Sequence, residues 1–276
     1  MFMTQLHEAV ILITGASGGF GQQLTRQLLE AGSRLILTDL DEDVLRERVE
    51  AIQAQVSTSK VIAIIPANLS TYQGCETLYH QVKALNIPID ILINNAGIGM
   101  FGRMDEVPSQ EWELLMQINL LAPMRLSSLF VADMIARKKG HIVNISSLAG
   151  WSAGAGMAHY AASKFGLRGL SEGLFNEVKG YNVRVTAVYP FFSRTPILQS
   201  QRYGTLAKYN RGIPDYMATD PAKVMQAAIR GIANNKLHVF PDFASQTIHL
   251  LKRYFPELLG WMSDAFDKKL QNAQLQ

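Results

Sequence analysis

The sequence predicts a doubly wound α/β fold, with a seven-stranded parallel sheet between two layers of helices (α/β/α). Short β-branched runs alternate with segments of helical periodicity, and these runs are apolar along almost their whole length. Continuously apolar strands are typical of parallel sheets that helices cover on both faces. The predicted strands are residues 10–14, 34–38, 61–65, 89–94, 141–146, 183–188 and 237–240.

The first predicted helix follows the first strand. Phe20, Leu24 and Leu28 recur every four residues and form one apolar stripe, and Gly32 marks the end of the helix. No internal repeat or low-complexity linker interrupts the chain before residue 240. We therefore expect residues 1–240 to form one domain.

Residues 241–276 form a predicted helical extension. Its apolar residues lie three or four positions apart, Pro256 interrupts them, and its polar face carries both signs of charge. Because a membrane-surface helix usually has a basic polar face, we expect the extension to pack on its own domain or on a partner subunit. The apolar stripe consists of Ile248, Leu251, Phe255, Leu258, Met262 and Phe266.

The composition excludes several classes of protein. A formal net charge of +3 over 276 residues, without a basic stripe, argues against a nucleic-acid partner. No apolar run reaches the ~18 residues of a membrane span, and no leader sequence is evident, so we expect no transmembrane span. The single cysteine, Cys75, and the absence of metal-ligand spacing among the histidines indicate a cytoplasmic protein without a metal site.

The segment "TGASGGFG" connects the first predicted strand to the first predicted helix. Here Gly15 permits a tight turn, Gly19 allows backbone to approach a pyrophosphate, and Gly21 allows helix and strand to pack closely. The start of the helix offers free N–H groups to an anion. In this position the segment favours dinucleotide binding over a plain turn.

Asp39 ends the second predicted strand, where a carboxylate can bond the ribose hydroxyls of an adenosine. A 2′-phosphate there would meet Asp39 and the acidic residues that follow it, so we favour NAD, while NADP stays possible if Arg46 or Arg48 folds back. The alternative is that Asp39 only caps the turn before the next helix.

Tyr160 and Lys164 lie one helical turn apart in "YAASK". A neighbouring ammonium group lowers the pKa of a phenol, so the pair is suited to exchange a proton with an alcohol or a ketone. Ser147 follows the fifth predicted strand, at the edge where such sheets bind ligands, and we expect its hydroxyl to hold the substrate oxygen. Strand alternation directs Ser146 to the opposite face, although both serines also suit a turn.

Asn119 lies inside a predicted helix, where asparagine is an unfavourable residue, and Pro123 follows four positions later. Because proline has no N–H, the Asn119 carbonyl loses its helical donor. We hypothesise that Pro123 exposes this carbonyl. A simple kink would explain Pro123 but not Asn119.

Together these motifs resemble the short-chain dehydrogenase/reductases. The resemblance covers residues 8–200 and rests on "TGASGGFG", "NNAG" at 94–97, Asn119, "ISS" at 145–147 and "YAASK". It implies a Rossmann fold, NAD(P)-dependent oxidation of alcohols or reduction of ketones, and a homodimer or homotetramer. Asn119, Ser147, Tyr160 and Lys164 match the family's catalytic residues, and a water links the asparagine position to the lysine in that family.

The resemblance also implies a set of cofactor contacts, in which Tyr160 and Lys164 take part and Thr195 holds the nicotinamide carboxamide. Two positions depart from the family pattern: Asn68 stands where the family often has aspartate near adenine, and Phe191 stands where it usually has glycine. The remaining expected contacts are Gly15, Ser17, Gly19, Phe20, Gly21, Asp39, Leu69, Asn95, Ala96 and Gly97.

The segments expected around the reacting carbon are apolar, which favours a hydrophobic secondary alcohol or ketone as substrate. Residues 197–217 are expected to form a lid. An alternative is an NADPH-dependent 3-oxoacyl-carrier reductase, with the basic cluster at residues 137–139 meeting an acidic carrier. A second alternative is a nucleotide-sensing or scaffold protein without turnover. The expected pocket residues are Met100, Phe101, Trp151, Met157, Phe191 and Phe192.

Overall fold

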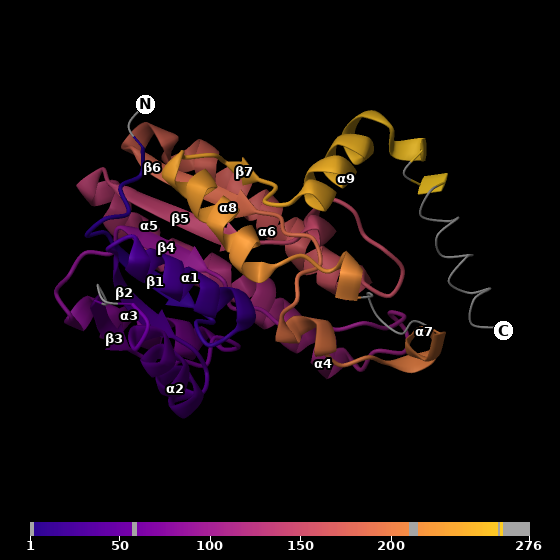
Figure 1. The fold of residues 1–276 in the computed structure, drawn as a ribbon, viewed down its shortest axis with the longest axis horizontal. Coiled ribbons are helices and arrows are strands. Elements are labelled where there is room, and N and C mark those ends of the chain that lie inside the picture. The colour runs from indigo at the N-terminus through magenta and orange to yellow at the C-terminus, as the bar shows by residue number, and fades with distance from the viewer. Residues whose placement is uncertain (1–2, 57–59, 210–214, 259, 262–276) are drawn as a thin grey trace.

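The computed structural model describes residues 3–56, 60–209, 215–258 and 260–261. Seven parallel strands form one sheet in the order β3-β2-β1-β4-β5-β6-β7 (Figure 1). The predicted fold class is confirmed. Three of the seven predicted strands have the observed bounds. The predicted strands at 61–65, 141–146 and 237–240 differ by one residue at each end, and the one at 89–94 begins two residues early. The strands are β1 Val10–Thr14, β2 Arg34–Thr38, β3 Lys60–Ile64, β4 Ile91–Asn94, β5 Gly140–Ile145, β6 Val183–Val188 and β7 His238–Val239.

Helices cover both faces of the sheet (Figure 1). One layer contains α1 (Gly19–Glu30), α2 (Glu42–Gln53) and α8 (Pro221–Ala233), and the other contains α3 (Tyr72–Ala84), α5 (Ala122–Arg137) and α6 (Ala158–Val178). Alternation along β1 divides the core accordingly. Ile11 and Ile13 pack in the cluster on the α1 side, whereas Val10 and Leu12 pack in the cluster on the α5 side. This two-sided burial explains why the strands are apolar throughout.

Shorter elements connect these layers, and all of them except η3, which leads into the start of β6, follow the carboxyl ends of strands. A π-helical turn, η1, continues α4 and joins it to α5 without a break. These elements are α4 Ser109–Met116, η1 Gln117–Leu121, η2 Leu148–Gly150, η3 Lys179–Tyr181, η4 Pro196–Gln199, α7 Gly204–Tyr209, η5 Asp215–Met217 and α9 Phe243–Tyr254.

The order of the strands reverses at β1, which pairs with β2 on one side and β4 on the other. The chain therefore leaves β1 and β4 toward opposite layers, and the carboxyl ends of these neighbouring strands open a crevice between the connecting loops. Doubly wound sheets bind their ligands at this point. The glycine-rich segment after β1 and the segment "NNAG" after β4 both lie there.

The extension begins with α9, which extends away from the sheet (Figure 1). Asp242 caps it, and the capping box with Ser245 is complete. The helix ends at Tyr254, and the helical pattern breaks at Phe255, just before Pro256, as predicted. Phe255 and Leu258 are exposed rather than packed on the domain, and the remaining predicted stripe residues Met262 and Phe266 lie outside the described residues.

One continuous helix of the described chain, Ser109–Arg137, is long and apolar enough to cross a membrane by length and composition. It consists of α4, η1 and α5. Leu126, Phe130 and Met134 on this helix are buried in the core against the sheet. Its apolar character therefore has an explanation within the domain.

Candidate active site

The glycine-rich turn fits closely against the loop after β4. Gly15 has a positive φ of 64°, and a Cβ atom there would lie 2.7 Å from the Cα of Ala96. Only glycine meets both conditions at this position. A Cβ at Gly21 would lie 2.1 Å from the carbonyl oxygen of Gly15, so the start of α1 also packs directly on the turn. The close packing predicted for Gly21 is present.

Thr14 joins the same two loops. Its hydroxyl accepts hydrogen bonds from the backbone N–H groups of Asn95 and Ala96, both at 3.0 Å. The Asn95 side chain returns two bonds of 2.9 Å, to the carbonyl oxygens of Thr14 and Gly15. Sequence reasoning missed Thr14. Its signal was a hydroxyl at the last position of an otherwise aliphatic strand.

Asp39 shapes the turn from the neighbouring strand. One of its carboxylate oxygens accepts hydrogen bonds from the Ser17 backbone N–H, at 2.9 Å, and from the Ser17 hydroxyl, at 2.6 Å. Asp39 does not cap the following helix, because the N-cap of α2 is Asp41. The first turn of α1 has no capping side chain and no acidic residue. Its N–H groups and the positive end of its dipole are suited to an anion.

Four other predicted cofactor contacts lie around this turn in different environments. A Cβ at Gly19 would lie 2.6 Å from the Thr195 side chain, so the loop after β6 closes onto the turn. Phe20 packs against the core rather than standing free. Leu69 is buried, and Asn68 uses its side-chain oxygen to hold Ser70 N at 3.0 Å. The Asn68 oxygen thus stabilises a local turn.

Ser147, Tyr160 and Lys164 come together where β5 leads through η2 to α6. The Ser147 hydroxyl accepts from Ala149 N at 3.1 Å and lies close enough to the Tyr160 phenol to lower its pKa. The Lys164 ammonium lies 5.6 Å from the centre of the Tyr160 ring and donates to the Ile145 carbonyl at 3.1 Å. Three polar groups with proton-handling chemistry therefore meet at the carboxyl edge of the sheet.

The electrostatics of this group differ from the sequence expectation. Burial raises the pKa of Tyr160 to about 12, and the nearby Ser147 hydroxyl opposes this effect without cancelling it. Burial also lowers the pKa of Lys164 to about 8. The chain by itself therefore keeps the phenol protonated at neutral pH, whereas the sequence predicted that the neighbouring lysine would lower its pKa.

Ser146 has a different task from Ser147, as strand alternation predicted. Its hydroxyl is buried and donates to the Lys164 carbonyl oxygen at 3.1 Å. This bond connects the end of β5 to the turn of α6 that carries the lysine. The Ser146 hydroxyl therefore supports the turn that carries Lys164.

Asn119 is fully buried in the π-helical turn. Its side chain bonds the backbone of Ile98 twice at 2.9 Å, through Oδ1 to the N–H and through Nδ2 to the carbonyl. Nδ2 also lies 3.4 Å from the Ser163 hydroxyl, which donates to the Tyr160 carbonyl. These contacts explain an asparagine inside a helix, and Ser163 is a connection that sequence reasoning missed within "YAASK". Pro123 has no N–H to bond the Asn119 carbonyl. The exposure of this carbonyl to a water stays a hypothesis.

Gly97 lies close to the side chains of both Asn119 and Lys164. A Cβ there would lie 3.3 Å from Asn119 Oδ1 and 3.6 Å from Lys164 Nζ. The loop after β4 therefore passes directly beside both side chains. By contrast Asn94, the last residue of β4, bonds Asn144 inside the core at 2.9 Å, which is a structural role.

The expected pocket residues divide into two groups. Met100 is buried in a cluster with Val107 and Leu115, against which Tyr160 also packs. The Phe101 ring lies against Gly156, next to Met157, the residue that precedes α6.

The second group lies toward β7 and α9. Phe191 and Phe192 contact each other edge to face, with ring centres 4.9 Å apart. The Trp151 ring packs against His249 of α9, at 4.3 Å, and under the Arg168 guanidinium. A cavity of about 500 Å³ lies beside Trp151 and is lined from α6, β7 and α9, away from Ser147 and Tyr160. The Trp151 ring thus has a packing role, and its place in a substrate pocket stays a prediction.

Comparison with known families decides the relationship. The model of the short chain dehydrogenase family matches residues 9–205.

The chain belongs to the short-chain dehydrogenase/reductase family.

Individual relatives agree with this assignment. The chain is 27% identical over 232 residues to an acetoacetyl-CoA reductase of Acinetobacter, with 84% of this chain and 93% of the relative covered. It is 34% identical over 190 residues to bovine 3-ketodihydrosphingosine reductase, covering 68% of this chain and 57% of that longer protein. It is 31% identical over 195 residues to a 3-oxoacyl-[acyl-carrier-protein] reductase of Thermotoga maritima, covering 71% and 78%.

Solved structures of dehydrogenases have the same fold over nearly the whole chain. One from Sphingobium yanoikuyae, in complex with NADPH, superposes with a TM-score of 0.76 at 25% identity and covers 96% of this chain and 94% of that one. The bulky-bulky ketone specific alcohol dehydrogenase of Comamonas testosteroni gives 0.74 at 26% identity, covering 91% and 94%. These similarities support assigning the chain to a family of oxidoreductases. They give no support to the alternative of a scaffold protein.

Proposed function

We propose that this short-chain dehydrogenase/reductase transfers hydride between a nicotinamide dinucleotide and a hydrophobic ketone or secondary alcohol. The observation that carries the proposal is the grouping of Ser147, Tyr160 and Lys164 beside the glycine-rich turn, at the carboxyl edge of the sheet. A hydroxyl next to a partly buried phenol and a buried amine is suited to hold a substrate oxygen and to move a proton. The nicotinamide ring supplies or accepts the hydride when the dinucleotide is bound.

The protein residues have separate tasks in this reaction. Ser147 donates a hydrogen bond to the substrate oxygen and keeps it near the phenol. Because the pKa of Tyr160 is raised to about 12, its phenol is protonated at neutral pH and is suited to give that proton to an alkoxide as a ketone is reduced. Lys164 places a cationic group behind the ring, and Asn119 holds the loop after β4 beside it.

The turn around Gly15 fits a dinucleotide, because the first turn of α1 offers uncapped N–H groups where a pyrophosphate would lie. Asp39 supports NAD over NADP. Arg46 is paired with Glu42 on α2 at 2.5 Å, and Arg48 lies 3.9 Å from Glu47. Neither arginine is paired with Asp39, so a 2′-phosphate would meet a carboxylate at this position. NADP is the competing proposal for the cofactor, because the similar dehydrogenase from Sphingobium yanoikuyae was solved in complex with NADPH.

The substrate class follows from apolar walls and from the relatives. Met100 and Phe101 come from the loop after β4, next to the cluster on which Tyr160 packs. The three relatives named above are reductases. Each of the substrates in their names carries a keto group at carbon 3 of a longer molecule. We therefore propose a 3-keto compound with an aliphatic portion as the first substrate to test.

The carrier-bound version of this substrate has less support. Arg137 and Lys139 of the basic cluster are both paired with Asp90, at 3.8 and 2.8 Å. Asp90 directly precedes β4, so the cluster lies at the amino end of the strands, opposite to Ser147. An acidic carrier bound there would be far from the reacting edge, and the free 3-keto compound is the better proposal.

The test compares NADH and NADPH in the reduction of a panel of 3-keto compounds and bulky ketones by wild type and by Tyr160→Phe. We expect the variant to lose about 10²- to 10⁴-fold in kcat, because the proton donor is gone, while cofactor binding persists. Tyr181→Phe, at an exposed tyrosine beyond α6, is the matched control and keeps full activity. Equal rates for wild type and Tyr160→Phe would refute the assignment. Tight cofactor binding without turnover of any compound would favour the nucleotide-sensing alternative.

A further inference from the structure

Two segments far apart in the sequence meet beside the proposed site. The loop after β4 and the segment after η4 form an isolated parallel bridge between Phe101 and Arg202. Phe101 N donates to Gln201 O at 3.1 Å, and Tyr203 N donates to Phe101 O at 2.8 Å. The second segment belongs to the lid predicted from the sequence at residues 197–217.

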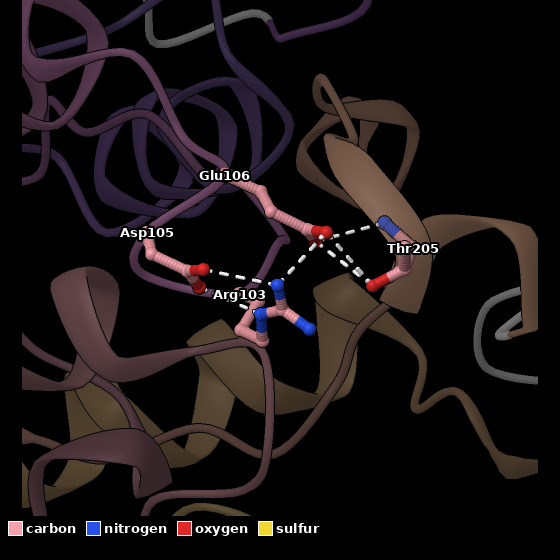
Figure 2. A network of polar contacts seen from close by, with 4 residues as sticks. All are labelled: Arg103, Asp105, Glu106 and Thr205. Carbon is pink, nitrogen blue, oxygen red and sulfur yellow. Dashed lines mark hydrogen bonds and ion pairs between the residues drawn. The ribbon is translucent and has the colours of Figure 1, made fainter.

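Glu106 fastens this segment just beyond the bridge (Figure 2). Its carboxylate accepts the Thr205 backbone N–H at 2.8 Å and the Thr205 hydroxyl at 2.9 and 3.0 Å. Arg103 lies 3.2 Å from the same carboxylate. Thr205 is the second residue of α7, so Glu106 satisfies a backbone donor that a helix start leaves without an intrahelical partner. The Glu106 side chain is only 18% exposed, although all its partners lie at the surface.

The backbone at Gly204 is adapted to this contact. Gly204 has a positive φ of 67°, and a Cβ there would lie 2.1 Å from Glu106 Oε2. A side chain at this position would therefore be strained and would also displace the carboxylate. The glycine lets Glu106 reach α7.

The fastened segment shares packing with the proposed acid. Tyr203 packs against the cluster of Met100, Val107 and Leu115, and Tyr160 packs against the same cluster. A Cβ at Gly102 would lie 3.0 Å from the Cβ of Tyr203, so the two segments are in close contact there. The position of residues 201–207 is thus connected to the apolar wall on which Tyr160 rests.

We propose that Glu106 is a positioning residue for the substrate. Its carboxylate fixes residues 201–207 against the loop after β4, and this fixed segment holds the aliphatic portion of the substrate next to Tyr160. The inference rests on the proposed function. Loss of the contact releases the segment and weakens substrate binding, whereas the groups that move the proton and hold the cofactor stay in place.

Asp105 provides a matched control from the same loop. It pairs with the same arginine, at 2.6 Å to Arg103 Nε, but it is 67% exposed and its removal leaves the bonds between Glu106 and Thr205 intact (Figure 2). Asp105→Asn and Glu106→Ala therefore remove the same charge at adjacent positions, and only the second releases α7. Thr205→Val is an intermediate variant, since it loses the hydroxyl bonds and keeps the backbone bond.

The test has two readouts on the full chain. The first is hydrogen–deuterium exchange of the amides in residues 201–207, which needs no substrate. We expect Glu106→Ala to speed exchange there about tenfold, which corresponds to ~1.4 kcal/mol, because Thr205 loses its charged acceptor; Asp105→Asn should exchange like wild type. Equal exchange in the two variants would overturn the inference, whether or not any substrate has been found.

The second readout is steady-state kinetics with the best 3-keto substrate. For Glu106→Ala we expect the KM for substrate to rise about tenfold, with kcat and the KM for the cofactor within about twofold of wild type. Faster exchange with an unchanged substrate KM would also overturn the positioning role. Should Glu106→Ala unfold, Glu106→Gln replaces it, because the amide keeps one acceptor for Thr205 and loses the pairing with Arg103. The same loss of kcat in both variants would count against the inference.

Discussion

Lys164 is a buried amine whose charge lowers the stability of the folded chain. Only 4% of the residue is exposed, and burial lowers its pKa from 10.5 to about 8. At 1.36 kcal/mol for each pH unit, keeping the amine charged in the folded state costs about 3 kcal/mol near neutral pH. Lys164→Met removes this charge with little change in length. It also removes the bond to the Ile145 carbonyl, which contributes about 1.5 kcal/mol or more. We therefore expect the variant to be inactive and more stable than wild type by about 1–2 kcal/mol at pH 7.

The pH dependence gives the decisive measurement. Between the folded pKa and the unfolded one, the unfolded chain binds a proton at Lys164 that the folded chain lacks, so wild-type stability rises with pH in this window. The advantage of Lys164→Met should shrink by about 2 kcal/mol between pH 7 and pH 9.5, as measured by urea denaturation. Tyr160 does not interfere, because its raised pKa affects stability only above pH ~10. Lys179→Met, at an exposed lysine just beyond α6, is the control for loss of a lysine. A constant difference between wild type and Lys164→Met over this range would refute the reasoning.

Two further predictions concern carboxylates that organise the loops. Asp39→Asn should shift the ratio of kcat/KM from NAD toward NADP by about tenfold, because a 2′-phosphate no longer meets a negative charge; an unchanged ratio in initial-rate assays would argue against it. Asp242 caps α9 and also accepts the Phe191 N–H at 3.0 Å. Asp242→Ala should lower the free energy of unfolding in urea by about 1–2 kcal/mol. It should also raise the KM for the cofactor, because the loop after β6, which brings Thr195 against Gly19, loses its bond at Phe191. Thr71→Ala, at the cap of α3, should lower stability alone, and equal kinetic effects from the two variants would contradict this view.

The strands were predictable because parallel sheets require an unusual pattern. A run such as Val10–Thr14 is apolar at consecutive positions, and only burial on both faces makes that favourable. The strand predicted at 237–240 is half as long in the structure, where only His238 and Val239 pair with β6. An edge strand has one neighbour, so its length depends on the partner strand rather than on its own residues.

The candidate site was predictable where chemistry needs a particular side chain at a particular edge of the sheet. Ser147, Tyr160 and Lys164 were expected together, and the structure brings them together. The pKa direction of Tyr160 was not predictable, since it depends on how much water the folded loops exclude from the ring. The side-chain bonds of Asn119 to Ile98 were also missed, because they join residues 21 positions apart through a π-helical turn that the sequence pattern does not reveal.

The sequence by itself therefore determined the sheet, its glycine-rich turn and the identity of the proton-handling residues, because local periodicity and short motifs encode these features. The tertiary structure alone decided how the loops meet. It connected Thr14 to the loop after β4, turned Trp151 toward α9 and fastened Thr205 to Glu106 across 99 positions. Contacts of this kind depend on how distant segments are placed relative to one another. That placement is set only when the helices have packed on the two faces of the sheet.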